Sequence, residues 1–213
     1  VAVNRAMQYK HLTVPPEWAP HAALWVGWPR LRVEWGEAFD GARDEIAAFI
    51  RAASAYVPVR VACGSDEARD SAARLVGPAS GKVVFVRVPS GDIWLRDTGP
   101  IIATRHDGTP RALRFVFNGW GGKYVMDGDT ETAAAIAAHE EIAITGHDFV
   151  LEGGGVDVDG AGGLLTTRQC LLNPNRNPGW DEMAATAALK AAFGVDRVTW
   201  LGDGLANDHT DGH

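Results

Sequence analysis

The amino-acid sequence predicts an α/β fold. Short runs of β-branched and aromatic residues, typical of strands, alternate with longer segments whose apolar residues recur every three or four positions, as in amphipathic helices. About three groups of strand, strand, helix and strand follow one another at intervals of roughly sixty residues, a spacing found in repeat proteins, but the sequence identity between the groups is too low to establish a repeat. No low-complexity linker separates these groups, so we expect a single domain over residues 1–213.

The first half of the chain is expected to alternate strands with helices. Apolar runs that end at proline or at turn residues are typical of buried strands, and Ser65 and Asp66 have side chains suited to cap a helix. In chain order, we expect a strand at Ala22–Trp28, a helix at Glu37–Tyr56, a strand at Val59–Cys63, a helix at Glu67–Val76 and a strand at Lys82–Val88.

The second half is expected to begin with a hairpin, because turn residues at His106–Thr109 separate two apolar runs. Asp129 and Asp181 each precede an alanine-rich segment and are expected to start helices, and Gly194 is expected to end the second one. In chain order, we expect strands at Ile101–Thr104 and Arg111–Phe117, a helix at Thr130–Ile142, strands at Phe149–Leu151, Gly155–Val158 and Leu164–Leu172, a helix at Glu182–Phe193, a strand at Arg197–Leu201 and a loop at Gly202–His213.

The composition argues against several classes of protein. A hydrophobic fraction of 46% and a charged fraction of 22% are ordinary for a globular protein and argue against intrinsic disorder. The formal net charge is -7, whereas nucleic-acid-binding domains usually carry a basic face; an acidic pocket would instead attract a small cation. No run approaches the ~20 apolar residues of a membrane helix, and Val1–His11 has no secretory signal pattern. Cys63 and Cys170 lie in separate apolar, strand-like runs, so we expect no disulfide framework and no thiolate zinc site, and a reducing, cytoplasmic setting.

Two loops combine tryptophan with polar residues or glycine. The segment Ser90–Pro100 presents Trp94 and Asp97 three residues apart; taken alone, this spacing favours a structural role, with a buried indole and an aspartate in a turn. The segment Asn118–Lys123 combines Trp120 with glycines that allow the backbone to approach a ligand closely, and a wide hairpin loop is an equally good interpretation.

Two further segments carry candidate chemistry. Glu152 directly follows an apolar strand and precedes three glycines, so we expect a partly buried carboxylate that needs a cationic or hydrogen-bonding partner, such as a cationic ligand. Asn207–His213 is the densest polar cluster, with His209 and His213 four residues apart. Because the Asp-Gly pair at Asp211 indicates a loop and no third ligand is evident, we favour an acid/base histidine over a metal site. A solvated acidic turn is the interpretation if this cluster acts alone.

Asp97, Glu152, the indoles and a histidine together predict a site for a planar cation. A guanidinium donates a fork of hydrogen bonds that matches carboxylates, and its face stacks on aromatic rings. Cleaving a C–N bond of such a group requires a strong nucleophile, usually a thiolate, and a histidine that protonates the departing ammonia and activates water. The sequence has the carboxylates and the histidine but no evident thiol for this purpose.

Over nearly its whole length, the chain resembles the agmatine deiminases, part of a guanidine-modifying superfamily that includes the peptidyl-arginine deiminases. The shared motifs are Glu17-Trp18, Pro20-His21, WVGWPR from Trp25, DIWLRDTGP from Asp92, FNGWGGK from Phe117, LEGGG from Leu151, LLTTRQCLLNPNRNP from Leu164 and TDGH from Thr210. The resemblance implies a pentein α/β propeller of five strand-strand-helix-strand units around a polar pocket. This chain would cover the first part of that fold and be truncated at its C-terminus.

The resemblance also implies roles for individual residues. Asp97 and Glu152 would bind the guanidinium, Trp94 would form an aromatic wall, and His213 would be the general acid/base. The aspartate that partners this histidine in the family lies two residues further on, and the nucleophilic cysteine lies in a glycine-rich segment near the carboxyl end. Neither cysteine of this chain matches that nucleophile.

The implied partner is a small cationic guanidino substrate, with Asn118, Trp120 and Asp211 as further substrate-binding residues. Agmatine-using relatives often carry an acidic residue four positions before the histidine, where this chain has His209, with Asp208 and Asp211 nearby. A carboxylate that meets the distal amine would contribute ~1–3 kcal/mol. The choice among guanidino compounds is therefore open.

The implied activity is hydrolysis of agmatine to N-carbamoylputrescine and ammonia, a step in putrescine biosynthesis, through a cysteine thiouronium intermediate. No metal, no organic cofactor, no nucleic acid and no membrane is implied, and a homo-oligomer is left open. The alternatives are a deiminase of peptidyl- or free arginine, a non-catalytic guanidine-binding module, and a metal hydrolase that uses His209 and His213 and is inhibited by chelators.

Overall fold

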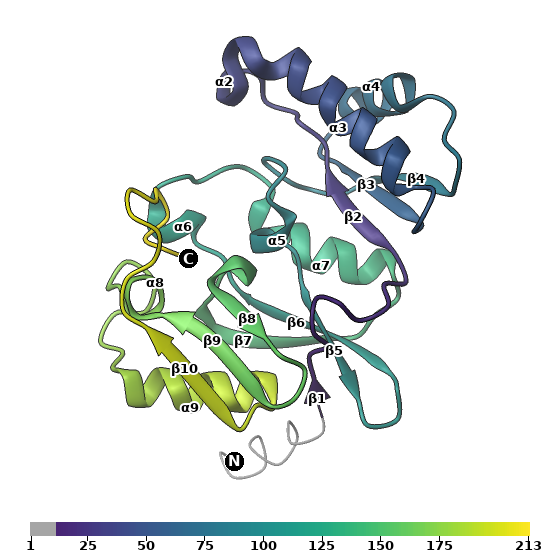
Figure 1. The fold of residues 1–213 in the computed structure, drawn as a ribbon. Coiled ribbons are helices and arrows are strands. Elements are labelled where there is room, and N and C mark those ends of the chain that lie inside the picture. Colours follow the sequence, from purple (N-terminus) through teal and green to yellow (C-terminus); the bar gives the residue numbers. More distant parts are fainter. Residues whose placement is uncertain (1–11) are drawn as a thin grey trace. The chain divides into compact units, whose positions relative to one another are not determined.

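The computed structural model describes residues 12–213, which form two compact units (Figure 1). Within the described residues, unit 1 comprises 12–19, 96–125 and 136–213, and unit 2 comprises 20–95 and 126–135. The strands of each sheet belong to a single unit. No helix in this part of the chain is both long and apolar enough to cross a lipid bilayer.

Unit 2 contains a parallel sheet in the order β2-β3-β4. Its elements are β2 (Leu24–Gly27), α2 (Arg32–Trp35), the 3-10 turn η1 (Gly36–Ala38), α3 (Phe39–Ala53), β3 (Val59–Cys63), α4 (Asp66–Val76) and β4 (Val83–Arg87). Val61 and Ala62 point to opposite faces of β3 and both are fully buried, so the central strand is covered on both sides, as is usual for parallel sheets. Trp28, also buried, donates its indole N–H to the hydroxyl of Ser71 on α4 (2.9 Å).

Unit 1 contains two sheets. The first has the order β1-β5-β6-β7, with antiparallel β1–β5 and β5–β6 pairs and a parallel β6–β7 pair. The second has the order β10-β9-β8, with a parallel β10–β9 pair and an antiparallel β9–β8 pair. The strands are β1 (Leu12–Thr13), β5 (Ile101–Arg105), β6 (Pro110–Val116), β7 (Ile144–Val150), β8 (Val156–Val158), β9 (Gly163–Thr167) and β10 (Arg197–Leu201).

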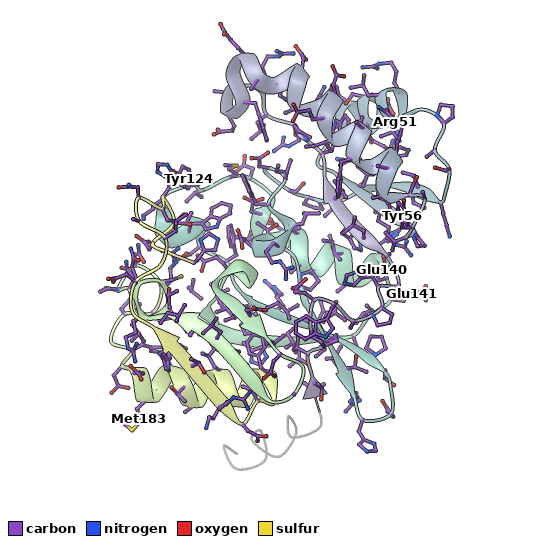
Figure 2. The ribbon with its side chains drawn as sticks, in the orientation of Figure 1. Arg51, Tyr56, Tyr124, Glu140, Glu141 and Met183 are labelled. Atoms are coloured by element: carbon purple, nitrogen blue, oxygen red, sulfur yellow. The ribbon has the colours of Figure 1, made fainter. Side chains whose placement is uncertain are left out.

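Helix α9 (Glu182–Phe193) closes the core of unit 1. Its buried side chains, including Leu189 and Phe193, pack with Leu113 of β6 and Leu164 of β9 in one apolar cluster. Met183 lies on the opposite side of the helix and points outward (Figure 2). The core therefore fixes the β-strands whose ends lead into the polar loops described below.

Many expected elements are confirmed. The bounds of β3 and β10 agree with the expected strands, and β5 and β6 form the expected hairpin. Ser65 caps α4 by accepting a hydrogen bond from the backbone N–H of Ala68 (3.0 Å). At α9, Asp181 accepts from the N–H of Ala184 (2.7 Å), and Gly194 ends the helix in the left-handed conformation (φ 68°).

Other expectations were wrong in detail. The strand expected at Leu164–Leu172 ends at Thr167, whose hydroxyl caps the short helix α8 (Arg168–Leu171) by accepting from the N–H of Cys170; Cys170 thus lies in a helix rather than a strand. Strand β7 starts at Ile144 rather than Phe149, and the segments expected to be loops contain α5 (Leu95–Thr98) and α6 (Gly119–Gly122). The helix expected at Thr130–Ile142 is α7 (Asp129–His139).

The described strands form three open sheets connected by helices (Figure 1). This arrangement confirms the mixed α/β class, and the propeller arrangement stays a prediction.

Candidate active site

Asp97 lies at the centre of a polar cluster in unit 1. It is carried by the single turn of α5 and is only 8% exposed. Its Oδ1 accepts from the backbone N–H of Gly154 (2.9 Å), and its Oδ2 accepts from the indole N–H of Trp120 (3.1 Å). Nε2 of His213 lies 3.3 Å from the same Oδ2. Both oxygens of this buried carboxylate are thus oriented by neighbours from separate loops.

Glu152 is the second buried acid of the cluster. It follows β7, precedes the 3-10 turn η2 (Gly153–Gly155) and is 1% exposed. Its Oε1 accepts from Nε of Arg176 (2.8 Å), whereas Oε2 is buried and has no hydrogen-bond partner among residues 12–213. Burial raises the pKa of Glu152, and the positive charge of Arg176 opposes that rise. A buried carboxylate oxygen without a protein partner is suited to accept a hydrogen bond from a ligand.

The glycines after Glu152 are required by the close approach of the backbone to the other site residues. A Cβ atom on Gly154 would lie 2.5 Å from Oδ1 of Asp97 and 2.8 Å from Cδ2 of His213. A Cβ on Gly153 would collide with the backbone of Arg96. The triple glycine therefore brings the η2 backbone against Asp97 and His213.

His213 is held by a loop, residues 207–213, that is organised by Asp208. Oδ2 of Asp208 accepts from the N–H (3.0 Å) and the hydroxyl (2.9 Å) of Thr210 and from the N–H of Gly212 (2.7 Å). The hydroxyl of Thr210 in turn bonds Nδ1 of His213. The hydrogen bond to Asp97 raises the pKa of His213, and the charges of Asp97, Glu152 and Asp208 act in the same direction. The ring therefore holds its proton to a higher pH than a free imidazole does, as suits a group that donates a proton.

Arg176 is a site residue that the sequence reasoning missed. Its guanidinium donates to Glu152 through Nε, to Asp211 through Nη1 (2.5 Å) and to the carbonyl of Thr210 through Nη2 (2.9 Å). The sequence predicts a cationic or hydrogen-bonding partner for the buried Glu152, such as a cationic ligand. In the structure, Arg176 of the same chain is such a partner. Arg176 lies in the motif LLTTRQCLLNPNRNP, which the chain shares with the agmatine deiminases. The arginine of that shared motif was the sequence feature that could have identified it as a site residue.

The turn formed by residues 173–177 holds Arg176 in place. The carbonyl of Asn173 accepts from the N–H groups of Arg176 (2.9 Å) and Asn177 (3.3 Å). The side-chain amide of Asn177 accepts from the N–H of Val150 (3.0 Å) and donates to its carbonyl (3.0 Å). The turn is thereby fastened to the end of β7, two residues before Glu152.

The remaining expected substrate-binding residues have protein partners. Asn118 caps α6 by accepting from the N–H of Gly121 (2.9 Å). Trp120, which is 4% exposed and has a left-handed backbone (φ 54°), presents its N–H to Asp97. Asp211 pairs with Lys123 (2.5 Å) and Arg176. Burial alone would raise the pKa of Asp211, but hydrogen bonds from these two cations and from an asparagine lower it to about 2.

Trp94 belongs to unit 2, where its indole N–H donates to Oδ2 of Asp92 (3.0 Å). The indole of Trp35 donates to Oδ1 of the same carboxylate (3.0 Å), so two tryptophans converge on Asp92. The role of Trp94 as an aromatic wall stays a prediction.

Neither cysteine has the properties of a nucleophile. Cys63, in β3, and Cys170, in α8, are fully or almost fully buried. Burial raises the pKa of each thiol to about 12, so both are protonated at neutral pH. The sequence-based expectation that neither thiol is the nucleophile agrees with this environment.

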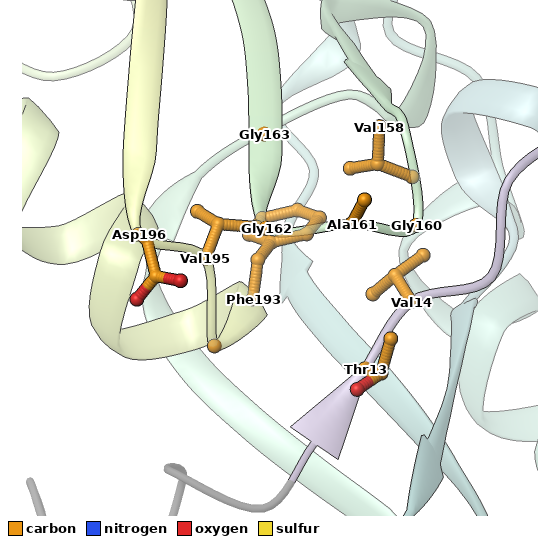
Figure 3. A pocket seen from close by; sticks show the side chains of 11 residues that line it. Thr13, Val14, Val158, Gly160, Ala161, Gly162, Gly163, Phe193, Val195 and Asp196 are labelled. Atoms are coloured by element: carbon orange, nitrogen blue, oxygen red, sulfur yellow. The ribbon is translucent and has the colours of Figure 1, made fainter.

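Two cavities of unit 1 lie away from these side chains. One of about 240 Å³ is lined by the Gly160–Gly163 segment, Val14 and Phe193 (Figure 3). The other, of about 190 Å³, is lined by residues that include Trp18 and Arg197. The second cavity is also lined by Asp157 and Asp159, and Arg197 pairs with Asp159, but the lining of neither cavity includes Asp97, Glu152 or His213. Among residues 12–213, no three or more His, Cys, Asp or Glu side chains are arranged to hold a metal ion.

The fold and the cluster define an α/β protein that brings together two buried carboxylates and a partly buried imidazole, an arrangement suited to a small cation. The chain belongs to the Porphyromonas-type peptidyl-arginine deiminase family, whose family model matches residues 13–213.

Curated relatives agree with this membership. The chain is 37% identical to the agmatine deiminase of Pseudomonas aeruginosa (strain UCBPP-PA14) over 206 residues and 38% identical to that of Pseudomonas fluorescens (strain SBW25) over 209 residues. Each match covers 94% of this chain and 55% of the relative. The chain therefore spans little more than half the length of these relatives.

Solved structures have the same fold. The agmatine deiminase of Enterococcus faecalis matches with a TM-score of 0.89 and 30% identity, covering 98% of this chain and 57% of that protein. The agmatine deiminase of C. jejuni with substrate bound matches with a TM-score of 0.84 and 27% identity, covering 95% of this chain and 60% of that protein.

Proposed function

We propose that this protein hydrolyses the guanidino group of agmatine to a ureido group and releases ammonia. The observation that carries the proposal is the buried Oε2 of Glu152, which lacks a protein partner in the described chain, in the same cluster as Asp97 and His213. A substrate guanidinium would supply the missing donors and the compensating charge. The similarity to agmatine deiminases over 94% of the chain supports this substrate class.

The charges around the site favour agmatine over free arginine. Lys123 and Arg176 are both ion-paired with Asp211, and Arg96, which precedes Asp97 in α5, is paired with Glu17. Among residues 12–213, none of these three cations is left without an acidic partner to bind the α-carboxylate that distinguishes arginine from agmatine. Deimination of free arginine is therefore the weaker proposal.

The proposed reaction proceeds in two stages. A cysteine thiolate attacks the guanidinium carbon, and the tetrahedral adduct expels ammonia after His213 transfers a proton to the departing nitrogen. His213 then takes a proton from water, which attacks the resulting thiouronium carbon and releases the thiolate and N-carbamoylputrescine. The cysteine is assigned to the family's carboxyl-terminal part, because the environments of Cys63 and Cys170 keep both thiols protonated.

Two structural predictions accompany this function. The three open sheets would be part of a five-unit pentein propeller, and both units would belong to one catalytic domain. A cytoplasmic location and a homo-oligomer stay predictions.

The function is tested by ammonia release from agmatine, arginine and a peptidyl-arginine by the protein expressed from its complete gene. We expect release from agmatine. Asp97→Asn should lower kcat/KM by about a hundredfold or more, because charge-assisted hydrogen bonds contribute ~1.5–3 kcal/mol each.

The matched control is Asp148→Asn, which changes an exposed aspartate of the same unit. Calorimetry with agmatine distinguishes the non-catalytic alternative, which predicts heat of binding without ammonia. Unchanged turnover in Asp97→Asn would contradict the role of Asp97.

A further inference from the structure

The side chain of Arg176 has no solvent exposure (0%) and makes four hydrogen bonds. A guanidinium has five N–H groups, so this one is almost fully satisfied by the protein. The acceptors around Arg176 therefore already bind one guanidinium, that of the protein's own arginine. Arg176 thus sets the geometry and the charge that an incoming guanidinium encounters.

The two ends of this guanidinium contact different parts of the cluster. Nε binds Oε1 of Glu152, which follows β7. Nη1 and Nη2 bind Asp211 and the carbonyl of Thr210, in the loop that ends at His213. Arg176 thus connects the proposed substrate carboxylate with the proposed acid/base histidine in a single planar group.

The contact with Arg176 also gives the two oxygens of Glu152 different roles. Because Arg176 occupies only Oε1, Oε2 is left for a ligand. A bidentate pair with Arg176 would have used both oxygens and closed the site. The turn at residues 173–177, which carries Arg176, is fastened to Val150 by the side-chain amide of Asn177.

We propose that Arg176 is a positioning residue that binds Oε1 of Glu152 so that Oε2 is directed to the substrate, and that keeps the 207–213 loop in place so that His213 meets Asp97. This inference rests on the proposed function for its substrate. It assigns to Arg176 no contact with the reacting atoms.

The charge environment gives this proposal a distinctive pH signature. Glu152 is influenced by Arg176 of the 173–177 turn and by His213, and Cys170 of α8 also lies in its field. Asp97 and Asp211 add negative charge nearby. Arg176 is the cation that opposes the effect of burial most strongly, so its removal should raise the pKa of Glu152.

The test measures the titration of the Glu152 carboxyl by carbon-13 NMR, assigned by comparison with Glu152→Gln, together with the pH profile of kcat/KM for agmatine. In Arg176→Gln, we expect the Glu152 midpoint and the acidic limb of the profile to move up by more than about one pH unit. Activity at neutral pH should fall by about a hundredfold and recover in part as the pH rises. An unmoved Glu152 midpoint would overturn the proposal.

Arg176→Lys covers the case in which the glutamine variant fails to fold. Lysine keeps the charge but cannot reproduce the fork to Thr210 and Asp211. We expect a nearly unchanged acidic limb and a KM within a few-fold of wild type, but a kcat at least about tenfold lower because His213 is less well positioned. An unchanged kcat would contradict the role in positioning His213.

The matched control is Arg197→Gln, since Arg197 is exposed on β10 of the same unit and pairs with Asp159. It should alter neither readout. If the wild-type protein releases no ammonia from agmatine, the proposed function fails, and the NMR titration still decides whether Arg176 controls Glu152.

Discussion

Each unit of the molecule buries a carboxylate that has one unpartnered oxygen, and the two differ in what holds the other oxygen. In unit 2, Asp129 is 3% exposed and its Oδ1 accepts from the backbone N–H of Gly91 (2.7 Å). In unit 1, Glu152 is 1% exposed and its Oε1 accepts from the guanidinium of Arg176. Oδ2 of Asp129 and Oε2 of Glu152 lack hydrogen-bond partners within residues 12–213.

The difference separates a structural acid from a candidate functional one. Burial raises the pKa of Asp129, and its nearest partners are uncharged amides that anchor the loop after β4. Glu152 has a fixed cation and shares its cluster with Asp97 and His213. Burial alone therefore does not identify a functional carboxylate; the charge of its partner and the chemistry of its neighbours do.

The largest effect expected is a loss of activity in Gly154→Ala, a substitution that changes no charge in the cluster around Glu152. Gly154→Ala would place a methyl group 2.5 Å from Oδ1 of Asp97, so Asp97 and His213 must shift. A displacement of this size should lower kcat/KM for agmatine by about a hundredfold. Gly146→Ala on β7, where a Cβ meets nothing within 4 Å, is the control and should retain activity. Equal activity in the two variants would show that the site tolerates displacement.

An intermediate effect is expected in unit 2, on stability. Asp129→Ala removes the acceptor of the buried N–H of Gly91 and should lower the free energy of unfolding by ~1–3 kcal/mol. Denaturant unfolding measures the change. Asp127→Ala, at an exposed position two residues earlier, should stay within about 0.5 kcal/mol of wild type. A loss in Asp129→Ala no larger than that of Asp127→Ala would remove the structural role assigned to Asp129.

The smallest effect concerns the pH dependence of stability. The pKa of His213 is raised in the folded protein, so the imidazolium stabilises the fold below the unfolded value of 6.5, and this contribution is lost as the pH rises through the folded value. The difference in the free energy of unfolding between wild type and His213→Gln should therefore decrease as the pH rises above 6.5. The decrease should be less than ~1 kcal/mol. Thermal unfolding at several pH values measures this; an advantage that grows with pH has the opposite sign and would contradict the pairing with Asp97.

Local sequence signals were sufficient where local physics decides the structure. The caps at Ser65 and Asp181, the stop at Gly194 and the apolar run of β3 each depend on residues that are adjacent in the chain. The same holds for Glu152, whose burial follows from its place after an apolar strand. These elements needed no knowledge of distant contacts.

The missed features depend on contacts between distant residues. The 173–177 turn contacts β7 and the 207–213 loop, so no local pattern reveals that Arg176 neutralises Glu152. The early end of β9 depends on whether the hydroxyl of Thr167 caps α8 or stays in a strand, which β-propensity does not decide. Strand β7 was shortened in the prediction because Gly146 and polar residues interrupt its apolar pattern.

The side chain of Asn177 behaves as a one-residue continuation of the sheet, since it exchanges two hydrogen bonds with the backbone of Val150 as a neighbouring strand would. Its neighbour Arg176 reaches Glu152 from the same turn. Inserting or deleting one residue before this pair would displace the amide from the strand and the guanidinium from the carboxylate together. Variation in length should therefore be tolerated in the hairpin between β5 and β6 but not here.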